Sequence, residues 1–519
     1  MKIMKRNHII IFLLLVLTSS VLSSCDDTLK EDPVIFVNPD EFYKNESQCK
    51  AAVNYLYYPL TQFYKRELLF ATDLTSDLSY FYGTNVDPVN FFGISPASPG
   101  TVAINGWTAC YSGIMQANNA IKGIERSPLE DETKKELMGE AACLRGFYYY
   151  ILTELFNDVP FYLDEVFTFA DQDRISKLPR MSANATRDSV INDLEQYIEY
   201  LPIKLPSDAS FQRASRQFAY MLIAKMAMKN YDYALAKQNL LKIRAIYGIL
   251  DPNIYTIDDL WFSNKNRPES IFEVQYMYDP SGIKKASGVS YSMMPPLTTA
   301  GTDIFDGVSI PFIGKASSRS NPATPSNYFI SLYDKISEEL DPGLNGIDLR
   351  KKITLADGFN GVQFDRVKKG GKPYFGIKFW TPDMISTNDG NNQPVFRYAD
   401  AILMLAECYN EEPNRDATQA LALLQEIRER AGYVTFFIKT DKKSILKEIQ
   451  EERARELFGE YQRKFDLVRW GIYYNQVKST SGYESMTIYD NIRPYHKYLP
   501  IPDAEVIRSK GVLTNEDYQ

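Results

Sequence analysis

Apolar residues recur every three or four positions through much of the first half of the chain. One set runs from Ile104 to Ile121, a second from Leu137 to Leu155 and a third from Val190 to Leu201. Such spacing places the apolar side chains of each segment on one face of a helix. The sequence therefore predicts amphipathic helices over 104–121, 137–155 and 190–201.

Further helical patterns come in pairs. Residues 214–230 and 232–248 read as two helices with a short turn near Asn230, and helical patterns return in "FRYADAILMLAECYN", "DATQALALLQEIRERAG" and "KKSILKEIQEERARELFGE". Helix pairs in series are typical of tetratricopeptide-type solenoids. Because no clean 34-residue repeat is visible, this prediction rests on helix pairing and not on self-similarity.

The helical pattern fades between residues 252 and 394. Gly, Pro, Ser and Asn become frequent there, and short β-like runs such as "SIFEVQYMY" and "YFGIKFW" appear. A long irregular region inside a compact domain is usually functional. We therefore predict a mainly α fold, a tetratricopeptide-like helix-pair scaffold (an α-α superhelix) with a large irregular, partly β ligand-binding insertion.

The N-terminus has the layout of a secretory signal. Three basic residues precede nine apolar ones, Ile9 to Leu17, and small residues follow. That run is too short to span a bilayer, which needs about 20 residues. The stretch from Leu22 to Cys25 resembles a bacterial lipobox, with a plain signal peptide and an incidental cysteine as the alternative. Acyl chains on Cys25 would anchor the protein to a membrane, and Asp26 and Asp27 resemble the export tag of surface lipoproteins.

These patterns give a domain organisation. We predict a signal peptide over 1–24, a lipidated tether over 25–40 and a single domain over 41–519. Within that domain we expect a helical scaffold over 41–251 with a binding loop over 73–95, an irregular ligand-binding region over 252–394, and C-terminal helices and a tail over 395–519.

Charge and composition exclude several classes of function. Loss of residues 1–24 removes three basic side chains and no acidic one, so the net charge falls from −8 to −11. Without a basic tract, nucleic acid is not expected as a partner. His496 would be the only histidine left, which excludes zinc sites with several imidazoles and argues against a Ser-His-Asp triad. The mature cysteines lie in apolar helical contexts typical of buried thiols, while a Cys110–Cys143 bridge stays open.

Several segments together resemble one family. They are "WTACYSGIMQANNAIKGI", "GEAACLRGFYYYILTELFNDVPFY", "PESIFEVQY", "FRYADAILMLAECYN", "IRERAG", "EERARELFGEYQRKFDLVRWG" and "YLPIPDAEV". With the lipobox, this series resembles the SusD/RagB family of outer-membrane nutrient-binding lipoproteins, from Cys25 to the C-terminus. Departures from the family pattern occur at Gly146, Asn157, Thr514 and Glu516, and they affect local turns.

The resemblance implies a function as well as a fold. It implies an extracellular lid over a SusC-like, TonB-dependent transporter, which binds a nutrient, commonly a glycan, and passes it to the pore. It thus implies polysaccharide utilisation without catalysis, a location on the cell outer membrane and no cofactor.

The charged family motifs have two interpretations. Arg397, Asp400 and Glu407 lie among apolar residues, and Glu451 to Arg469 alternate in sign. A carboxylate pair for acid–base chemistry is one interpretation, and two carboxylates also suffice for glycoside hydrolysis. A structural network of ion pairs is the interpretation we favour, because oppositely charged residues three apart meet on one helix face.

Ligand binding is expected where the helical pattern breaks, on loops held by the scaffold. Aromatic residues crowd 73–93 and recur in the irregular middle. A sugar ring stacks its CH face on a flat side chain while Asp and Asn bind its hydroxyls. Loop-anchoring core is the alternative for any single ring. The candidate ligand-binding residues are Asp77, Tyr80, Phe81, Tyr82, Asn85, Phe91, Phe92, Tyr278, Tyr291, Phe305, Phe312 and Tyr328.

Finer aspects of specificity receive weaker support. Trp107, Trp261 and Trp470 fall in framework segments, so sugars would stack mainly on Tyr and Phe, which argues mildly against starch. The acidic net charge favours a neutral glycan, and peptide or another nutrient on the same scaffold is the alternative cargo. No metal is expected, although Asp341, Asn345 and Asp348 offer oxygen ligands suited to a structural Ca²⁺.

Overall fold

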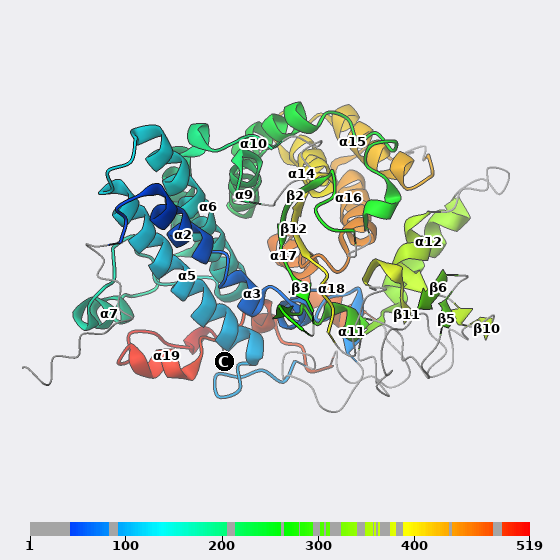
Figure 1. The fold of residues 1–519 in the computed structure, drawn as a ribbon. Helices are drawn as coiled ribbons and strands as arrows, with labels where there is room; N and C mark the ends of the chain where they lie inside the picture. The colour runs from blue at the N-terminus through cyan, green and yellow to red at the C-terminus, as the bar shows by residue number, and fades with distance from the viewer. Residues whose placement is uncertain are drawn as a thin grey trace, which may run out of the picture.

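The computed structural model describes residues 42–81, 92–204, 213–260, 264–279, 281–293, 302–305, 308–311, 323–339, 348–356, 358–359, 362–363, 374–379, 388–434, 439–480 and 490–518. Figure 1 shows a curved array of helices, with the N-terminal helices at one end, β2 and β12 in the middle, and strands such as β5, β6 and β11 at the other end. The fold is mainly α with a tetratricopeptide-like arrangement of helices, as the sequence predicted.

Helix α6 (Asp131–Phe156) lies at the centre of the N-terminal half. Every residue from Leu137 to Phe156 is buried, so this part of the helix has no face toward solvent. Polar groups within it are paired: Arg145 binds Asp193 at 2.5 Å, and Glu154 binds Lys229 at 2.8 Å. A helix buried on all sides acts as the core against which its neighbours pack.

The predicted helices form, with one difference at an end. Residues 104–121 lie in α5 (Thr101–Glu125), and 137–155 lie in α6. The third helix, α8 (Ala183–Glu195), stops earlier than predicted, and Ile198–Tyr200 form the 3₁₀ turn η2. Pro202 follows closely, and a proline disfavours helical backbone in the residue before it.

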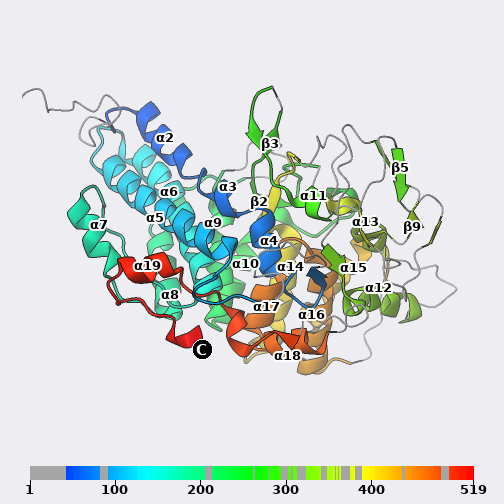
Figure 2. The same cartoon turned by 90° about the horizontal axis from the view of Figure 1, so that it is seen from below.

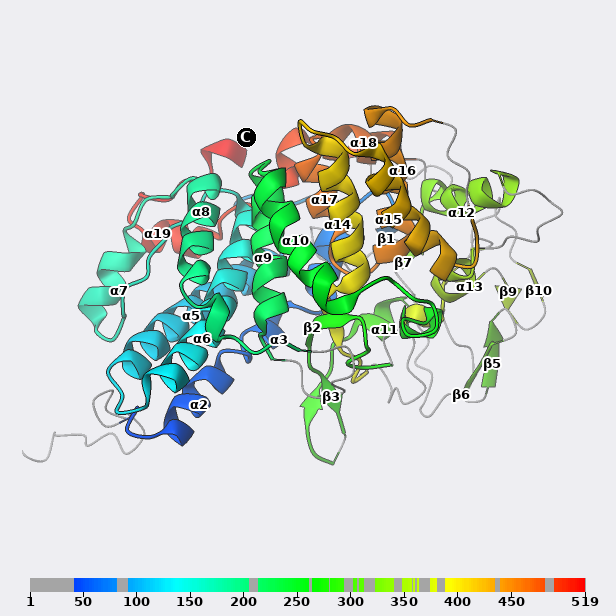
Figure 3. The same cartoon turned by 90° about the horizontal axis from the view of Figure 1, so that it is seen from above.

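Helices then follow in antiparallel pairs along the array. The predicted pair over 214–248 is α9 (Arg216–Lys229) and α10 (Tyr233–Tyr247), which pack together. Asp232 accepts a hydrogen bond from the backbone N–H of Leu235, which fixes the start of α10 directly after the turn. The chain later returns as α14 (Tyr398–Glu411) and α15 (Ala417–Arg430), and α14 packs against α10 (Figure 3).

The C-terminal helices close the array. Helix α16 (Lys442–Leu457) packs on α14 and α15, and α17 (Arg463–Arg469) and α18 (Tyr473–Ser479) follow it. Gly459, between α16 and α17, has a positive φ of 78°, a backbone conformation that favours glycine. The remaining helices are α2 (Glu46–Tyr55), α3 (Leu60–Phe63), α4 (Arg66–Thr72), α7 (Phe169–Ser176), α11 (Val289–Met293), α12 (Asn327–Glu339), α13 (Arg350–Thr354) and α19 (Asp503–Arg508).

The described part of the predicted irregular region consists of short antiparallel strands together with helices α11, α12 and α13. Strand β2 (Ser270–Val274) pairs with β12 (Gln393–Arg397), so the two ends of the region meet, and β12 leads directly into α14. The run "YFGIKFW" is strand only over Tyr374–Phe375 and continues as the 3₁₀ turn η4 (Ile377–Phe379). The other strands are β1 (Ser79–Phe81), β3 (Met277–Tyr278), β4 (Lys284–Lys285), β5 (Thr302–Phe305), β6 (Val308–Pro311), β7 (Ala323–Pro325), β8 (Leu355–Ala356), β9 (Gly358–Phe359), β10 (Val362–Gln363) and β11 (Tyr374–Phe375).

The cysteines of the described chain are all free thiols. Cys49, Cys110, Cys143 and Cys408 are buried, which confirms the buried-thiol prediction and excludes the Cys110–Cys143 bridge in this structure. Burial raises the pKa of the Cys110 and Cys143 thiols well above the ordinary range. Within the described residues, no helix is long and apolar enough to cross a membrane.

Two glycines of α5 give a test of the α5–α6 contact. A Cβ atom at Gly113 would lie 2.2 Å from the ring of Tyr148, which is fully buried and donates its hydroxyl hydrogen bond to the Leu56 carbonyl. A Cβ atom at Gly106 would meet Leu155 at 3.4 Å, an ordinary contact. We expect Gly113→Ala to lower the free energy of unfolding by about 1–3 kcal/mol through overpacking, measured by urea unfolding. Gly106→Ala is the matched control and should leave stability unchanged or raise it by up to about 1 kcal/mol. Equal changes in the free energy of unfolding for Gly113→Ala and Gly106→Ala would contradict this packing of α5 on α6.

Candidate functional site

Two segments that the sequence singled out separately meet in the fold. Strand β1, within the predicted binding loop, pairs antiparallel with β7 of the irregular region, with Tyr80 opposite Thr324. The Ser326 backbone N–H donates to the Leu78 carbonyl at 2.9 Å, and the Ser326 hydroxyl donates to the Asp77 carbonyl at 2.6 Å. The β1–β7 junction is therefore a tertiary feature that joins residues some 245 positions apart.

The foot of the loop is fixed to the C-terminal helices. Arg463 on α17 donates two hydrogen bonds to the Asp77 carboxylate, at 2.8 and 2.7 Å, and Gln476 on α18 donates a third at 3.1 Å. The carboxylate is fully buried. Asp77 thus has a structural role here, because both oxygens of its carboxylate accept hydrogen bonds from protein side chains.

Tyr80 and Phe92 are also interior residues. Their exposed fractions are 1% and 6%, and they pack in a small core with Tyr473, Val477 and Ile492 beneath the loop. Phe92 stacks on His496 with ring centroids 5.6 Å apart. In this arrangement both rings anchor the loop, which is the alternative that the sequence left open, and we do not assign them a direct ligand contact.

Three candidate tyrosines are partly exposed. Tyr291 lies on α11, which packs against α4 and β7, and Tyr328 lies at the start of α12, directly after β7. Both therefore flank the β1–β7 junction. Burial raises the pKa of Tyr328 to about 12, so its hydroxyl stays protonated and able to donate at neutral pH. Tyr278 lies apart, on the β3–β4 hairpin that projects from the body in Figures 2 and 3, where its hydroxyl accepts from Asn388.

Other predicted residues are not placed. Tyr82, Asn85, Phe91 and Phe312 lie outside the described residues, as do Cys25, Asp341 and Asn345. For Phe81 on β1 and Phe305 on β5, the structure describes the backbone alone. These assignments stay predictions.

A buried network of ion pairs lies beneath the junction and spans the C-terminal half. Arg397 binds Glu269, Glu456 and Glu460 at 2.7–3.0 Å, and Arg430 binds Glu269 and Glu456. Burial alone would raise the pKa of Glu456, but the guanidinium groups of Arg430, Arg397 and Arg350 together hold it well below its usual range. The network prediction for these motifs is confirmed, with two differences. The charges lie in the core, and Arg397 lies on β12 and does not pair with Asp400 on a helix face, as the spacing had suggested.

Buried ion pairs also account for the carboxylates that the sequence marked for possible chemistry. Asp400 binds Arg453 and Lys225, and Glu407 binds Arg469. Asp348 binds Arg350 through both of its oxygens. Within the described ranges, no three His, Cys, Asp or Glu residues are grouped as a metal site would require. His496 is buried against Phe92, and burial lowers its pKa to about 3, so it is neutral at physiological pH.

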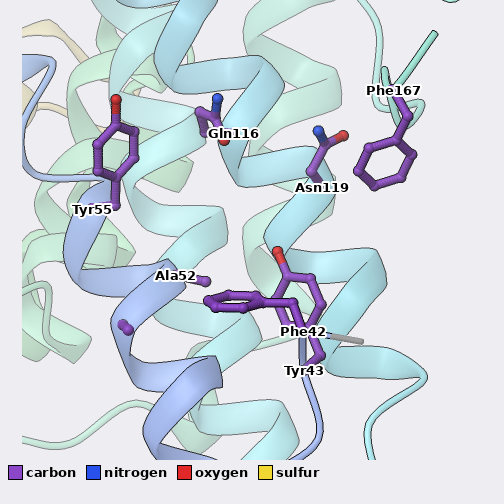
Figure 4. A pocket seen from close by; sticks show the side chains of 8 residues that line it. Phe42, Tyr43, Ala52, Tyr55, Gln116, Asn119 and Phe167 are labelled. Atoms are coloured by element: carbon purple, nitrogen blue, oxygen red, sulfur yellow. The ribbon is translucent and has the colours of Figure 1, made fainter. Parts of the chain in front are cut away.

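The helical half also carries two hollows that the sequence analysis missed. One, of about 510 Å³, lies between α5, α7 and α19 and is lined in part by Trp107, Tyr111 and Tyr162 and by the ion pair of Glu505 and Arg508. The other, of about 370 Å³, lies beside α2 and α5. Figure 4 shows its aromatic and amide side chains. The only sequence signal was the density of aromatic residues in "EFYKNESQCKAAVNYLYY", which also fits ordinary helix packing.

Comparisons with known proteins agree with this architecture. A family model described as "SusD family" matches residues 374–518, and one described as "Starch-binding associating with outer membrane" matches 96–228. The SusD-like protein P25 of Formosa agariphila is 24% identical, with 99% of each chain covered.

Solved structures show the same fold. The surface glycan-binding protein A from Bacteroides thetaiotaomicron, in complex with laminarihexaose, is 21% identical with a TM-score of 0.68, covering 91% of this chain and 99% of that one. A laminarin-binding SusD-like protein is 23% identical with a TM-score of 0.70, covering 92% and 100%.

The role of Asp77 can be tested by stability. We expect Asp77→Asn to lower the free energy of unfolding by about 3 kcal/mol, because it leaves the buried Arg463 without its full counter-charge. Asp490→Asn, at an exposed residue paired with Lys478, should change stability by less than about 0.5 kcal/mol. Urea unfolding measures both. If Asp77→Asn were as stable as the parent, the framework role would be wrong.

Lys464 gives a pH-dependent test of the core beneath the loop. It is buried on α17 with its ammonium 5.2 Å from the centroid of the Tyr473 ring, and burial lowers its pKa to about 7. Since the folded state disfavours the charged form, stability should fall as the pH drops from the unfolded pKa near 10.5 to about 7. We expect Lys464→Met to raise stability by on the order of 2 kcal/mol at pH 6, and by progressively less toward pH 10.

The control for this trend is Lys447→Met, at a lysine with 70% of its side chain exposed. Urea unfolding at pH 6, 8 and 9.5 should show no such trend for the control. A gain at Lys464→Met that did not depend on pH would mean that the burial of the charge is not the cause.

Proposed function

The chain belongs to the SusD/RagB family, and on this premise we propose that it is a cell-surface lipoprotein that captures a glycan and delivers it to a SusC-like, TonB-dependent outer-membrane transporter. Residues 1–24 would direct export and acyl chains on Cys25 would anchor the chain to the outer membrane, which agrees with the outer-membrane association named in the family description. We further propose that it binds without catalysis and without a cofactor.

The observation that carries the glycan proposal is the β1–β7 junction. It joins two segments rich in aromatic residues, with Tyr291 and Tyr328 beside it. Flat rings that carry hydroxyl groups suit the CH faces and hydroxyl groups of sugars. The solved relatives that bind laminarihexaose and laminarin support the same ligand class.

The ion-pair network supports the proposal of a binder over an enzyme. The carboxylates of the family motifs are buried in the core and paired with arginines, so they are not placed to contact a substrate. A rigid charged core instead provides a firm base for the loops above it.

Affinity electrophoresis tests the function. Residues 26–519 are run through native gels cast with laminarin, starch, xylan, mannan or galactan. We expect retardation by at least one polymer, without its breakdown, and a neutral polymer because the chain is acidic. The double variant Tyr291→Ala/Tyr328→Ala should weaken the apparent affinity about tenfold, since each stacked ring contributes roughly 0.5–1.5 kcal/mol.

The control variant is Tyr200→Ala, at a partly exposed tyrosine of the helical half, which should run as the parent does. Retardation that is the same in the double variant and the parent would place the site elsewhere. No retardation by any of the five polymers would favour the alternative cargo, peptide or another nutrient, which co-purification with the transporter would then address.

A further inference from the structure

The hollow of about 370 Å³ beside α2 and α5 has the composition of a ligand site. Its lining comes from three separate stretches of the chain: α2 with the residues that precede it, the middle of α5 and the segment before α7. The lining residues are Phe42, Tyr43, Ala51, Ala52, Tyr55, Gln116, Asn119 and Phe167. Helices α2 and α5, which line this aromatic hollow, lie away from strands β1 and β7 (Figure 3).

Aromatic rings stand on several sides of the aromatic hollow. In Figure 4, Tyr55 stands on one side and Phe167 on the other, with Phe42 and Tyr43 between and below them. Tyr55 and Phe167 keep 52% and 44% of their surface exposed, and Tyr55 also stacks on Tyr58 with ring centroids 5.9 Å apart. Phe42 and Tyr43 pack edge to face, with centroids 5.0 Å apart. The hollow thus offers partly exposed aromatic surface.

The walls of the aromatic hollow are held in place. The Asn119 amide donates to the Val166 carbonyl at 3.1 Å and accepts from the Val166 N–H at 2.9 Å, which fixes the segment that carries Phe167. Tyr43 lies against α5 where Gly123 has no Cβ, since that atom would stand 2.2 Å from the ring. These contacts preorganise two of the rings, which lowers the ordering cost of binding.

Polar groups in the aromatic hollow remain available. Among the described residues, the Gln116 amide and the hydroxyls of Tyr43 and Tyr55 make no hydrogen bond to a protein group. Burial raises the pKa of Tyr43 to about 12, so its hydroxyl is a donor at neutral pH. Together with Gln116, these groups supply both donors and acceptors beside the rings.

The chemistry of the lining selects the class of ligand. None of the eight lining residues carries a charge, so nothing in the wall compensates an anionic or a cationic group. Ring faces that alternate with neutral amide and hydroxyl groups fit a neutral, hydroxyl-bearing ring. A volume of about 370 Å³ lies within the usual range for small-molecule pockets, roughly 300–1,000 Å³.

We propose that the aromatic hollow is a second saccharide-binding site, which holds a neutral mono- or disaccharide unit between Tyr55 and Phe167 with Gln116 as its polar contact. The choice of a saccharide rests in part on the proposed function, whereas the location is independent of it. A second site on the same chain would raise the avidity for a polymer that reaches both.

Saturation-transfer NMR tests the site on residues 26–519. The probes are laminaribiose, cellobiose, maltose, mannobiose and diacetylchitobiose, with choline as a cationic probe. We expect saturation transfer to at least one disaccharide. Tyr55→Ala/Phe167→Ala, which removes both rings, should weaken that binding by about tenfold or more, and Ala52→Phe should weaken it by filling the hollow. Gln116→Leu should weaken it at nearly constant side-chain volume.

The matched control is Phe169→Ala, two residues from Phe167, 91% exposed and outside the lining; it should bind as the parent does. Circular dichroism and urea unfolding verify that each variant is folded, and Tyr55 and Phe167 are exposed enough for their loss to be tolerated. Disaccharide binding that is equal in the parent, Tyr55→Ala/Phe167→Ala and Ala52→Phe would overturn the proposal, as would transfer to choline alone or to no probe.

The two proposals fail in different ways. Loss of gel retardation in Tyr291→Ala/Tyr328→Ala with disaccharide binding that still depends on Tyr55 and Phe167 supports both sites. Disaccharide binding at the aromatic hollow without retardation by any polymer would overturn the polymer-capture function and keep the hollow as a saccharide site. Gel retardation by a polymer, together with disaccharide binding that the hollow variants do not change, would overturn the site in the hollow and keep the polymer-capture function.

Discussion

The buried guanidinium–carboxylate network around Arg397 and Glu456 is the constraint on which the C-terminal half of the structure depends. It ties β12, α13, α15, α16 and the residue before β2 to one another through groups that are almost fully removed from water. Breaking one partner leaves a buried charge uncompensated, which costs about 3–5 kcal/mol. The network therefore specifies how these elements pack, beyond the general drive to bury apolar surface.

The ligand-binding proposals depend on that rigidity. Arg463, on the helix that follows α16, donates two hydrogen bonds to the Asp77 carboxylate. The foot of the loop is therefore fixed to the C-terminal helices. Tyr80 and Phe92 then fill the space between loop and helices. Residues that looked like contact groups in the sequence are the ones that hold the loop, while partly exposed rings such as Tyr291 and Tyr328 are left beside the junction. The aromatic hollow has a similar arrangement, because hydrogen bonds from Asn119 to the Val166 backbone fix the segment that carries Phe167.

Much of the scaffold was predictable because its signals are local. The periodicity of 104–121 and 137–155 determines α5 and α6, and the capping residue Asp232 marks the start of α10. The alternation of charges in "EERARELFGEYQRKFDLVRW" indicated ion pairing before any contact was known. Sequence did not reveal that these charges are buried, because the same alternation is found on solvated helix faces.

The sequence by itself determined the class of fold, the family resemblance and the two stretches rich in aromatic residues, since each depends on residue type and short-range spacing. Only the tertiary structure decided which aromatic residues are anchors and which are accessible. Tyr80 and Tyr328 have similar sequence surroundings. Tyr80, on β1, is nevertheless buried in the small core, whereas Tyr328, on α12, is partly exposed. The aromatic hollow was beyond sequence reasoning for the same reason: burial and the meeting of Tyr55, Gln116 and Phe167 depend on the packing of segments more than 50 residues apart.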